Sequence, residues 1–147
     1  MYHRILVPTD GSGLSQKAVD SAIEQAAACG SELVVLHILP VPPPFHFDGT
    51  MRSTALHAIR LETTRTAHGK LLVEQVEAAA ARAGVKCQGV LAHADAVAEA
   101  ILATAKEHQC DLIVMASHGR QGIERVLFGS QAEDVLADGS LPVLVLR

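Results

Sequence analysis

The segment with the clearest potential for chemistry is a glycine-punctuated stretch that follows an apolar run near the C-terminus. The run Leu112–Met115 leads into a stretch with three glycines, which ends in Gly129 and Ser130 at the start of a predicted helix. Glycine lets a backbone approach a ligand closely and present its N–H groups, and a helix N-terminus adds unpaired donors and partial positive charge. These features suit a phosphate group.

Spacing alone leaves two interpretations of this stretch equally open. In one, the stretch binds phosphate, and Arg120 and Arg125 supply counter-charge. In the other, it is a connector in which Ser130 only caps a helix.

A second polar segment follows the first apolar run, Ile5–Val7. Asp10 could accept hydrogen bonds from a ligand there, or it could cap the following turn through Ser12. A dinucleotide-binding turn is excluded, because Gln16 replaces its third glycine and the second strand ends in Ile38-Leu39, where an acidic ribose-binding residue would be needed. No phosphate loop of the Walker type is present either.

Hydrolase and metal chemistry find little support. Ser117 and His118 adjoin without a nucleophile elbow, so His118 is predicted to line the loop. His57 and His68 are predicted on one helix, where their spacing corresponds to roughly 16 Å, too far to share a metal. We therefore expect Mg²⁺ only in company with a nucleotide's phosphates.

The elements that must position these segments are short apolar strands alternating with helices. Four of the five apolar runs are continuous rather than alternating, as is typical of strands covered by helices on both faces. The pattern predicts one open parallel sheet with right-handed crossovers and helices on both faces, an α/β fold. The five runs are Ile5–Val7, Leu33–Ile38, Gly89–Leu91, Leu112–Met115 and Val143–Leu146.

Helix ends are indicated by glycines and by capping residues. The first helix is predicted to end at Gly30, and a long one is expected from near Met51 to Ala83. Asp95 is predicted to cap a third helix, and a short last helix is predicted between Ser130 and Gly139. The proline-rich stretch 39–49 is predicted to be a stiff loop.

Composition limits the class of protein. The chain has 147 residues, 49% of them hydrophobic and 19% charged, which predicts one folded domain over 1–147. Its formal net charge of -4 argues against nucleic-acid binding. Three dispersed cysteines and no apolar run long enough for a membrane span predict a cytoplasmic protein that does not enter a membrane.

The glycine segment resembles the signature Gly-x2-Gly-x9-Gly-Ser/Thr of ATP-binding universal stress proteins. Gly119, Gly129 and Ser130 match it, whereas Ala116 replaces the first glycine. The resemblance covers nearly the whole chain, because the first, fourth and last strands also look like those of the family. These matching segments are Arg4–Ser12, Cys110–Met115 and Leu141–Val145.

The resemblance implies a five-stranded sheet in the order 3-2-1-4-5, with nucleotide across the ends of strands 1 and 4. That location agrees with the general rule that ligands bind where the strand order reverses. Adenosine and ribose are expected near strands 1, 2 and 4, and phosphates at the glycine segment. The implied nucleotide-binding residues are Pro8, Thr9, Asp10, Ile38, Met115, Ala116, His118, Gly119, Arg120, Gly129, Ser130 and Gln131.

The family assignment implies a function of binding and regulation. It predicts an ATP-dependent regulatory or stress-response protein, at most a slow ATPase, with Mg²⁺ on the phosphates and AMP or cyclic AMP as other candidate ligands. It also implies a homodimer formed through the last strand, Val143–Leu146. The alternative is a nucleotide-independent dimeric interaction module of the same family. Ala116 is the residue that favours this alternative, and its methyl group would crowd the ribose or phosphates if the backbone there must come close to them or take a positive φ.

Overall fold

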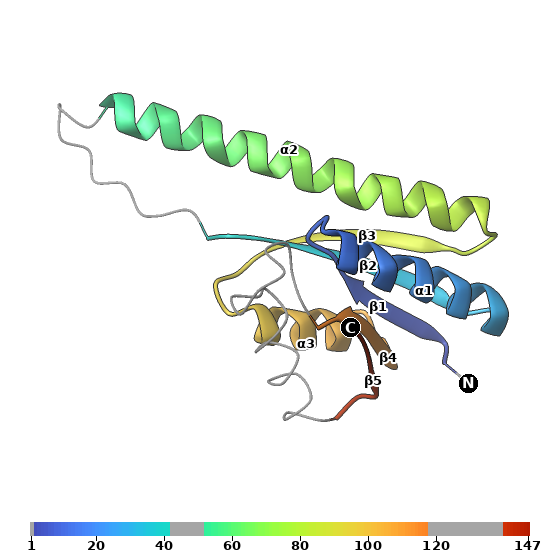
Figure 1. Ribbon diagram of the computed structural model, residues 1–147. Coiled ribbons are helices and arrows are strands. Elements are labelled where there is room, and N and C mark those ends of the chain that lie inside the picture. Colours follow the sequence, from blue (N-terminus) through green and yellow to red (C-terminus); the bar gives the residue numbers. More distant parts are fainter. Residues whose placement is uncertain (1, 42–51, 118–139) are drawn as a thin grey trace.

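The computed structural model describes residues 2–41, 52–117 and 140–147 (Figure 1). Strands and helices alternate along the described chain, as the apolar pattern predicts. In chain order the elements are β1 (Arg4–Pro8), α1 (Gly13–Cys29), β2 (Glu32–Leu39), α2 (Arg52–Arg82), β3 (Cys87–His93), α3 (Val97–Glu107), β4 (Leu112–Ala116) and β5 (Val143–Leu146).

The five strands form one sheet in the order β3-β2-β1-β4-β5, and every neighbouring pair is parallel. The predicted fold class and strand order are therefore confirmed. β1 lies at the centre, where the direction of strand addition reverses. The two edges are β3 and β5, which are only half-buried, whereas β1 and β4 are almost fully buried.

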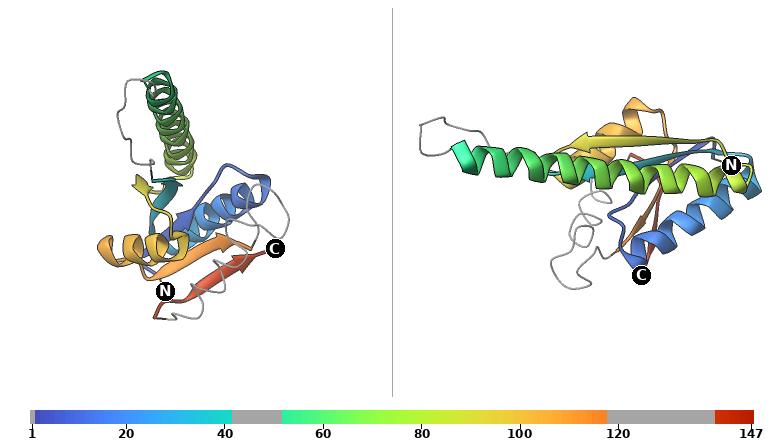
Figure 2. Two further views of the ribbon diagram at one scale, coloured as in Figure 1. Left: turned by 90° about the vertical axis from the view of Figure 1, so that its left-hand side faces the viewer. Right: turned by 90° about the horizontal axis from the view of Figure 1, so that it is seen from above.

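The helices cover both faces of the sheet. Figure 2 shows α1 and α3 on opposite sides of it. α1 packs on β1 and β4, and α2 packs on β2 and β3. The last helix predicted between Ser130 and Gly139 lies outside the described residues.

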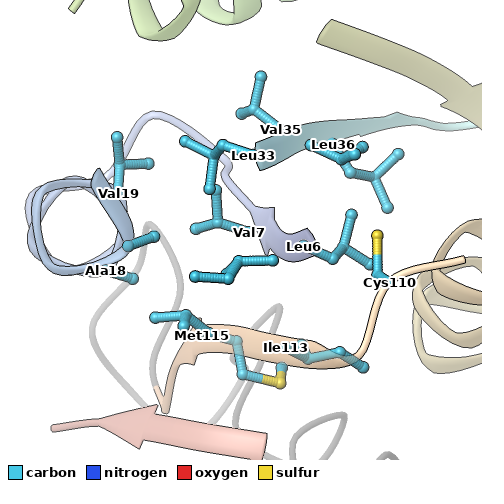
Figure 3. Packing of buried hydrophobic residues seen from close by; sticks show 14 of the residues in the cluster. Leu6, Val7, Ala18, Val19, Leu33, Val35, Leu36, Cys110, Ile113 and Met115 are labelled. Atoms are coloured by element: carbon cyan, nitrogen blue, oxygen red, sulfur yellow. The ribbon is translucent and has the colours of Figure 1, made fainter. Parts of the chain in front are cut away.

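α1 follows directly from its sequence. Ser12 caps it by accepting the Ser15 N–H at 3.2 Å, and small and branched apolar side chains line its buried face. It ends as predicted at Gly30, whose φ of +70° is unstrained only for glycine. Its face packs against β1, β2 and β4 in a core that includes Val7, Val19 and Met115 (Figure 3).

The prediction for the start of the third helix was wrong. α3 is capped by Ala96 rather than Asp95, and its N-cap makes no side-chain hydrogen bond. Burial of Ala98, Ile101 and Ala105 against the sheet therefore stabilises this helix without help from a cap.

α2 has 31 residues, which at 1.5 Å each corresponds to roughly 46 Å. Its N-terminal part extends past the end of the sheet (Figures 1 and 2). Leu56 and Ile59, on this part, are about half exposed. Among the described residues, no helix combines the length and apolarity needed to cross a membrane.

Candidate functional site

The candidate site begins where β1 and β4 separate. β1 pairs with β2 over all five of its residues, from Arg4 to Pro8. Its ladder with β4 comprises only Ile5 opposite Leu112 and Leu6 opposite Ile113. The carboxyl ends of these strands therefore diverge at the point where the strand order reverses, the usual location of a ligand crevice in an open α/β sheet.

The turn after β1 is held by a chain of hydroxyl hydrogen bonds. The Gly11 N–H donates to Thr9 Oγ1 at 3.2 Å, and Thr9 Oγ1 lies 3.1 Å from Ser15 Oγ. The Ser15 hydroxyl donates to the Ser12 carbonyl at 3.0 Å, so its hydrogen is used. Thr9 must therefore be the donor to Ser15. This network fixes the turn to the first residues of α1.

Asp10 is buried at this turn, with 7% exposure. Its Oδ1 accepts the Ser12 N–H at 2.9 Å, which is the Asx-type turn expected of this residue type. The capping role of Asp10 is thus confirmed. A contact with adenosine stays a prediction, and Asp10 lies two residues beyond the carboxyl end of β1, where that contact is expected.

The other predicted site residues on strands 1, 2 and 4 lie together at the carboxyl ends of these strands. Pro8 is buried, Ile38 is half-buried near the end of β2, and Met115 and Ala116 are fully buried at the end of β4. Figure 3 shows the Met115 side chain among the core residues. His118, Gly119, Arg120, Gly129, Ser130 and Gln131 lie outside the described residues.

Ala116 has the backbone of a strand residue. It is aligned with Leu146 of β5, and the only non-glycine residue with positive φ in the described part of the chain is Gln109. An alanine is therefore unstrained at this position. The positive φ that would make an alanine unfavourable at position 116 is therefore absent.

Leu36 and His37 of β2 form hydrogen bonds with Thr9, the residue that precedes Asp10. The Thr9 N–H donates to the Leu36 carbonyl at 2.8 Å. The Thr9 carbonyl lies 2.9 Å from Nδ1 of His37. Because a carbonyl can only accept, the imidazole must carry its proton on Nδ1. His37 could not be recognised from the sequence, because a histidine within an apolar run carries no spacing signal.

α2 contacts the same region through Gly69 and Leu72. A Cβ added at Gly69 would lie 2.6 Å from Cδ2 of His37, so the helix backbone and the imidazole are in close contact. Leu72 lies against Gly11, where an added Cβ would meet its Cδ2 at 3.2 Å. The close approach of Gly69 to a strand residue is visible only in three dimensions.

A groove of about 220 Å³ lies beside the turn, between α1 and α2. Its lining residues are Thr9, Gln16, Leu72, Gln75, Val76, Ala79 and Arg82. This groove is on the helix side of β1 and not between β1 and β4. It lies next to the predicted nucleotide site and shares Thr9 with it.

The described residues include no cluster of three or more His, Cys, Asp or Glu side chains that could hold a metal ion. The three cysteines, Cys29, Cys87 and Cys110, are free thiols. Burial raises the pKa of both Cys87 and Cys110 to about 11, which keeps them protonated and unreactive at neutral pH.

The parallel sheet in the order β3-β2-β1-β4-β5, with helices on both faces, defines a doubly wound α/β protein. Comparison with known proteins makes this specific. The model of the universal stress protein family matches residues 1–147, and the chain belongs to this family.

Two curated relatives match the whole chain and are themselves fully covered. Universal stress protein YxiE of Bacillus subtilis is 31% identical over 159 residues. A universal stress protein of Thermus aquaticus is 34% identical over 153 residues. Both alignments cover 100% of either protein, so the similarity is not confined to one motif.

Solved structures agree with the fold. Universal stress protein UspA from Lactobacillus plantarum has a TM-score of 0.81 at 25% identity, with 99% of this chain and 98% of the other covered. A universal stress protein in complex with cAMP has a TM-score of 0.69 at 23% identity, and one from Archaeoglobus fulgidus in complex with dAMP has 0.64 at 20%. Each covers 99% of this chain and 97% or more of its own.

Proposed function

We propose that this protein binds an adenine nucleotide, ATP by preference, in the crevice between β1 and β4 and acts as a nucleotide-dependent regulatory protein. The observation that carries the proposal is the divergence of β1 from β4 beyond Leu6, with the buried residues Thr9, Asp10 and Ser12 in the turn that follows β1. In the sequence, the glycine segment follows shortly after β4.

Two further observations support the proposal. The alanine that replaces the first signature glycine lies in unstrained strand backbone, so it does not distort the start of the loop. In addition, two proteins that share this fold are complexes with cAMP and dAMP, so the fold accommodates adenine nucleotides. Adenosine would lie near Pro8, Asp10 and Ile38, and phosphates near Gly119, Gly129 and Ser130, with Mg²⁺ held mainly by the phosphate oxygens.

The test is calorimetric titration of nucleotide-free protein with ATP, AMP and cAMP, each with Mg²⁺ and with EDTA. We expect saturable binding of about one ATP per chain that is lost in Gly129→Val. Asp10→Asn keeps the Oδ1 acceptor for the Ser12 N–H but removes the charge, and we expect weaker binding. Asp20→Asn is the matched control, because Asp20 is exposed on α1. Absence of binding by all three nucleotides at millimolar concentration would refute the proposal.

Binding, rather than turnover, is the activity that we propose. The described site holds no arrangement of groups that would activate a water molecule, so any hydrolysis is expected to be slow. Release of phosphate from ATP by the purified protein measures this directly. A rate that falls in both Asp10→Asn and His118→Ala would instead indicate a catalytic role for these residues.

We further propose that the chain forms a homodimer through β5. This strand is an edge of the sheet, and Leu144 at its centre is 40% exposed. Edge strands of this kind tend to pair with another chain. Analytical ultracentrifugation of Leu144→Lys is expected to show a monomer. Leu71→Lys, at an exposed leucine of α2, is expected to leave the dimer intact. If Leu144→Lys stays dimeric, the interface lies elsewhere.

A further inference from the structure

We infer that His37 is a positioning residue for the nucleotide site, acting through the Thr9 carbonyl, and that Gly69 of α2 provides the space that lets it do so. This inference rests on the proposed function. It assigns a role to two residues outside the crevice and connects the long helix to the turn that borders the site.

The register of the sheet places His37 next to Thr9. Pro8 is the last residue of β1 and is aligned with Leu36, so the chain leaves the ladder immediately after this pair. The Thr9 N–H still reaches the Leu36 carbonyl at 2.8 Å, and the imidazole Nδ1 donates to the Thr9 carbonyl at 2.9 Å. The side chain of His37 thus adds one hydrogen bond at the point where the chain turns away.

The Thr9 carbonyl determines where Asp10 lies. The carbonyl of Thr9 and the N–H of Asp10 belong to one planar peptide unit. A hydrogen bond that fixes the carbonyl direction therefore fixes the plane from which Asp10 departs. Because the Asp10 carboxylate accepts the Ser12 N–H, the orientation of the Thr9–Asp10 peptide also determines the position of Ser12.

The imidazole is held in a slot between α2 and β3. One edge of the ring, Cδ2 and Nε2, faces Gly69, where an added Cβ would lie 2.6 and 3.3 Å from these atoms. Leu91, which is aligned with His37 on β3, flanks the same slot. Glycine costs stability in the interior of a helix, so its presence at 69 is explained by the close approach that it permits.

The substitutions that separate positioning from packing follow from side-chain geometry. In asparagine the amide nitrogen is bonded to Cγ, as Nδ1 is in histidine, so His37→Asn keeps a donor near the Thr9 carbonyl. His37→Ala removes the donor. Gly69→Ala favours the helix but forces the ring of His37 aside. Exposed His68, next to Gly69 in the sequence, provides the matched control His68→Ala.

The first measurement is amide hydrogen exchange of the ligand-free protein, because it does not depend on nucleotide binding. We expect exchange at Gly11 and Ser12 to quicken about 5-fold in His37→Ala and Gly69→Ala, the factor that corresponds to one ordinary hydrogen bond. Exchange in β1 and β4 should stay unchanged, and His37→Asn should restore most of the protection. In the His37→Ala background, Gly69→Ala should have no further effect, because the ring that it displaces is gone.

The second measurement is the Kd for ATP of the same variants. Affinity should fall by about 5-fold in His37→Ala and Gly69→Ala and recover in His37→Asn. If the wild-type protein binds no adenine nucleotide, the proposed function fails, and the exchange experiment still decides the role of His37. Unchanged exchange at Gly11 and Ser12 in His37→Ala would overturn the inference, as would an equal rise over the whole sheet, which indicates packing alone.

Discussion

Gly11 lies in the turn after β1, and the effect of its replacement on the free energy of unfolding can be estimated from its conformation. Its φ is +82°, and an added Cβ would lie 3.2 and 3.3 Å from the two terminal carbons of Leu72. A left-handed conformation costs a residue with a Cβ about 1–2 kcal/mol. Leu72 has a flexible side chain and can move, so the contact adds little to this cost.

Gly13, two residues further on, offers a matched control. It is the first residue of α1, its φ is not positive, and an added Cβ meets nothing within 4 Å. Replacement of either glycine by alanine restricts the unfolded chain to the same extent, worth about 0.5 kcal/mol in favour of folding. This term cancels in the comparison, so Gly11→Ala should be less stable than Gly13→Ala by about 1–2 kcal/mol.

Thermal and urea unfolding followed by circular dichroism measure this difference. For a chain of this length it corresponds to a gap in Tm of about 3–6 °C, with Gly13→Ala at or slightly above the wild type. Equal Tm values for the two variants would refute the assigned conformation of the turn. Gly11→Ala should also bind ATP more weakly, because the turn that holds Asp10 must shift.

Three further predictions concern stability and reactivity. Burial opposes ionisation of Asp111, but backbone N–H groups of His3, Arg4 and Asp111 itself outweigh it and lower the pKa of this carboxyl. Because the pKa of Asp111 is lower in the folded than in the unfolded state, its ionised carboxylate stabilises the fold above the unfolded pKa of about 4, and this stabilisation is lost as the pH falls through the folded pKa. Urea titrations at pH 7 should therefore show Asp111→Asn to be less stable than the wild type by about 1 kcal/mol. This difference should shrink below pH 4. Ile113→Ala, at a fully buried position of β4, should lower the free energy of unfolding by about 2–5 kcal/mol, whereas Leu71→Ala, at an exposed leucine, should have a small effect in the same titration. Cys87 and Cys110 have pKa values of about 11, so only about 1 in 1,000 of each thiol is ionised at pH 8. Mass spectrometry after iodoacetamide treatment should therefore show Cys29 modified first. Rapid labelling of Cys87 would contradict its burial.

Much of the fold could be predicted from the sequence because its signals are local. Continuous apolar runs are typical of strands that helices cover on both faces, and all five runs form strands. The glycine after α1 ends that helix as predicted, because only a residue without a Cβ adopts its φ at no cost. The prediction failed at α3, where Asp95 has the chemistry of an N-cap but the chain enters the helix one residue later. Cap preference is weak compared with the burial that positions the helix.

For the site, sequence and tertiary structure determine different things. The sequence by itself determined the fold class and the family, and it identified Asp10 at the end of the first strand, because strand, turn and helix signals are carried by neighbouring residues. Only the tertiary structure decided which residues support that turn. His37, Gly69 and Leu72 lie 28 to 63 positions from Thr9 along the chain. His37 and Leu72 contact the turn through the register of β1 with β2 and the packing of α2 on the sheet, and Gly69 contacts His37. The physical reason is that such contacts depend on the distance between two elements that are far apart in the sequence. Tertiary packing sets this distance, and neither a residue type nor a local spacing indicates it.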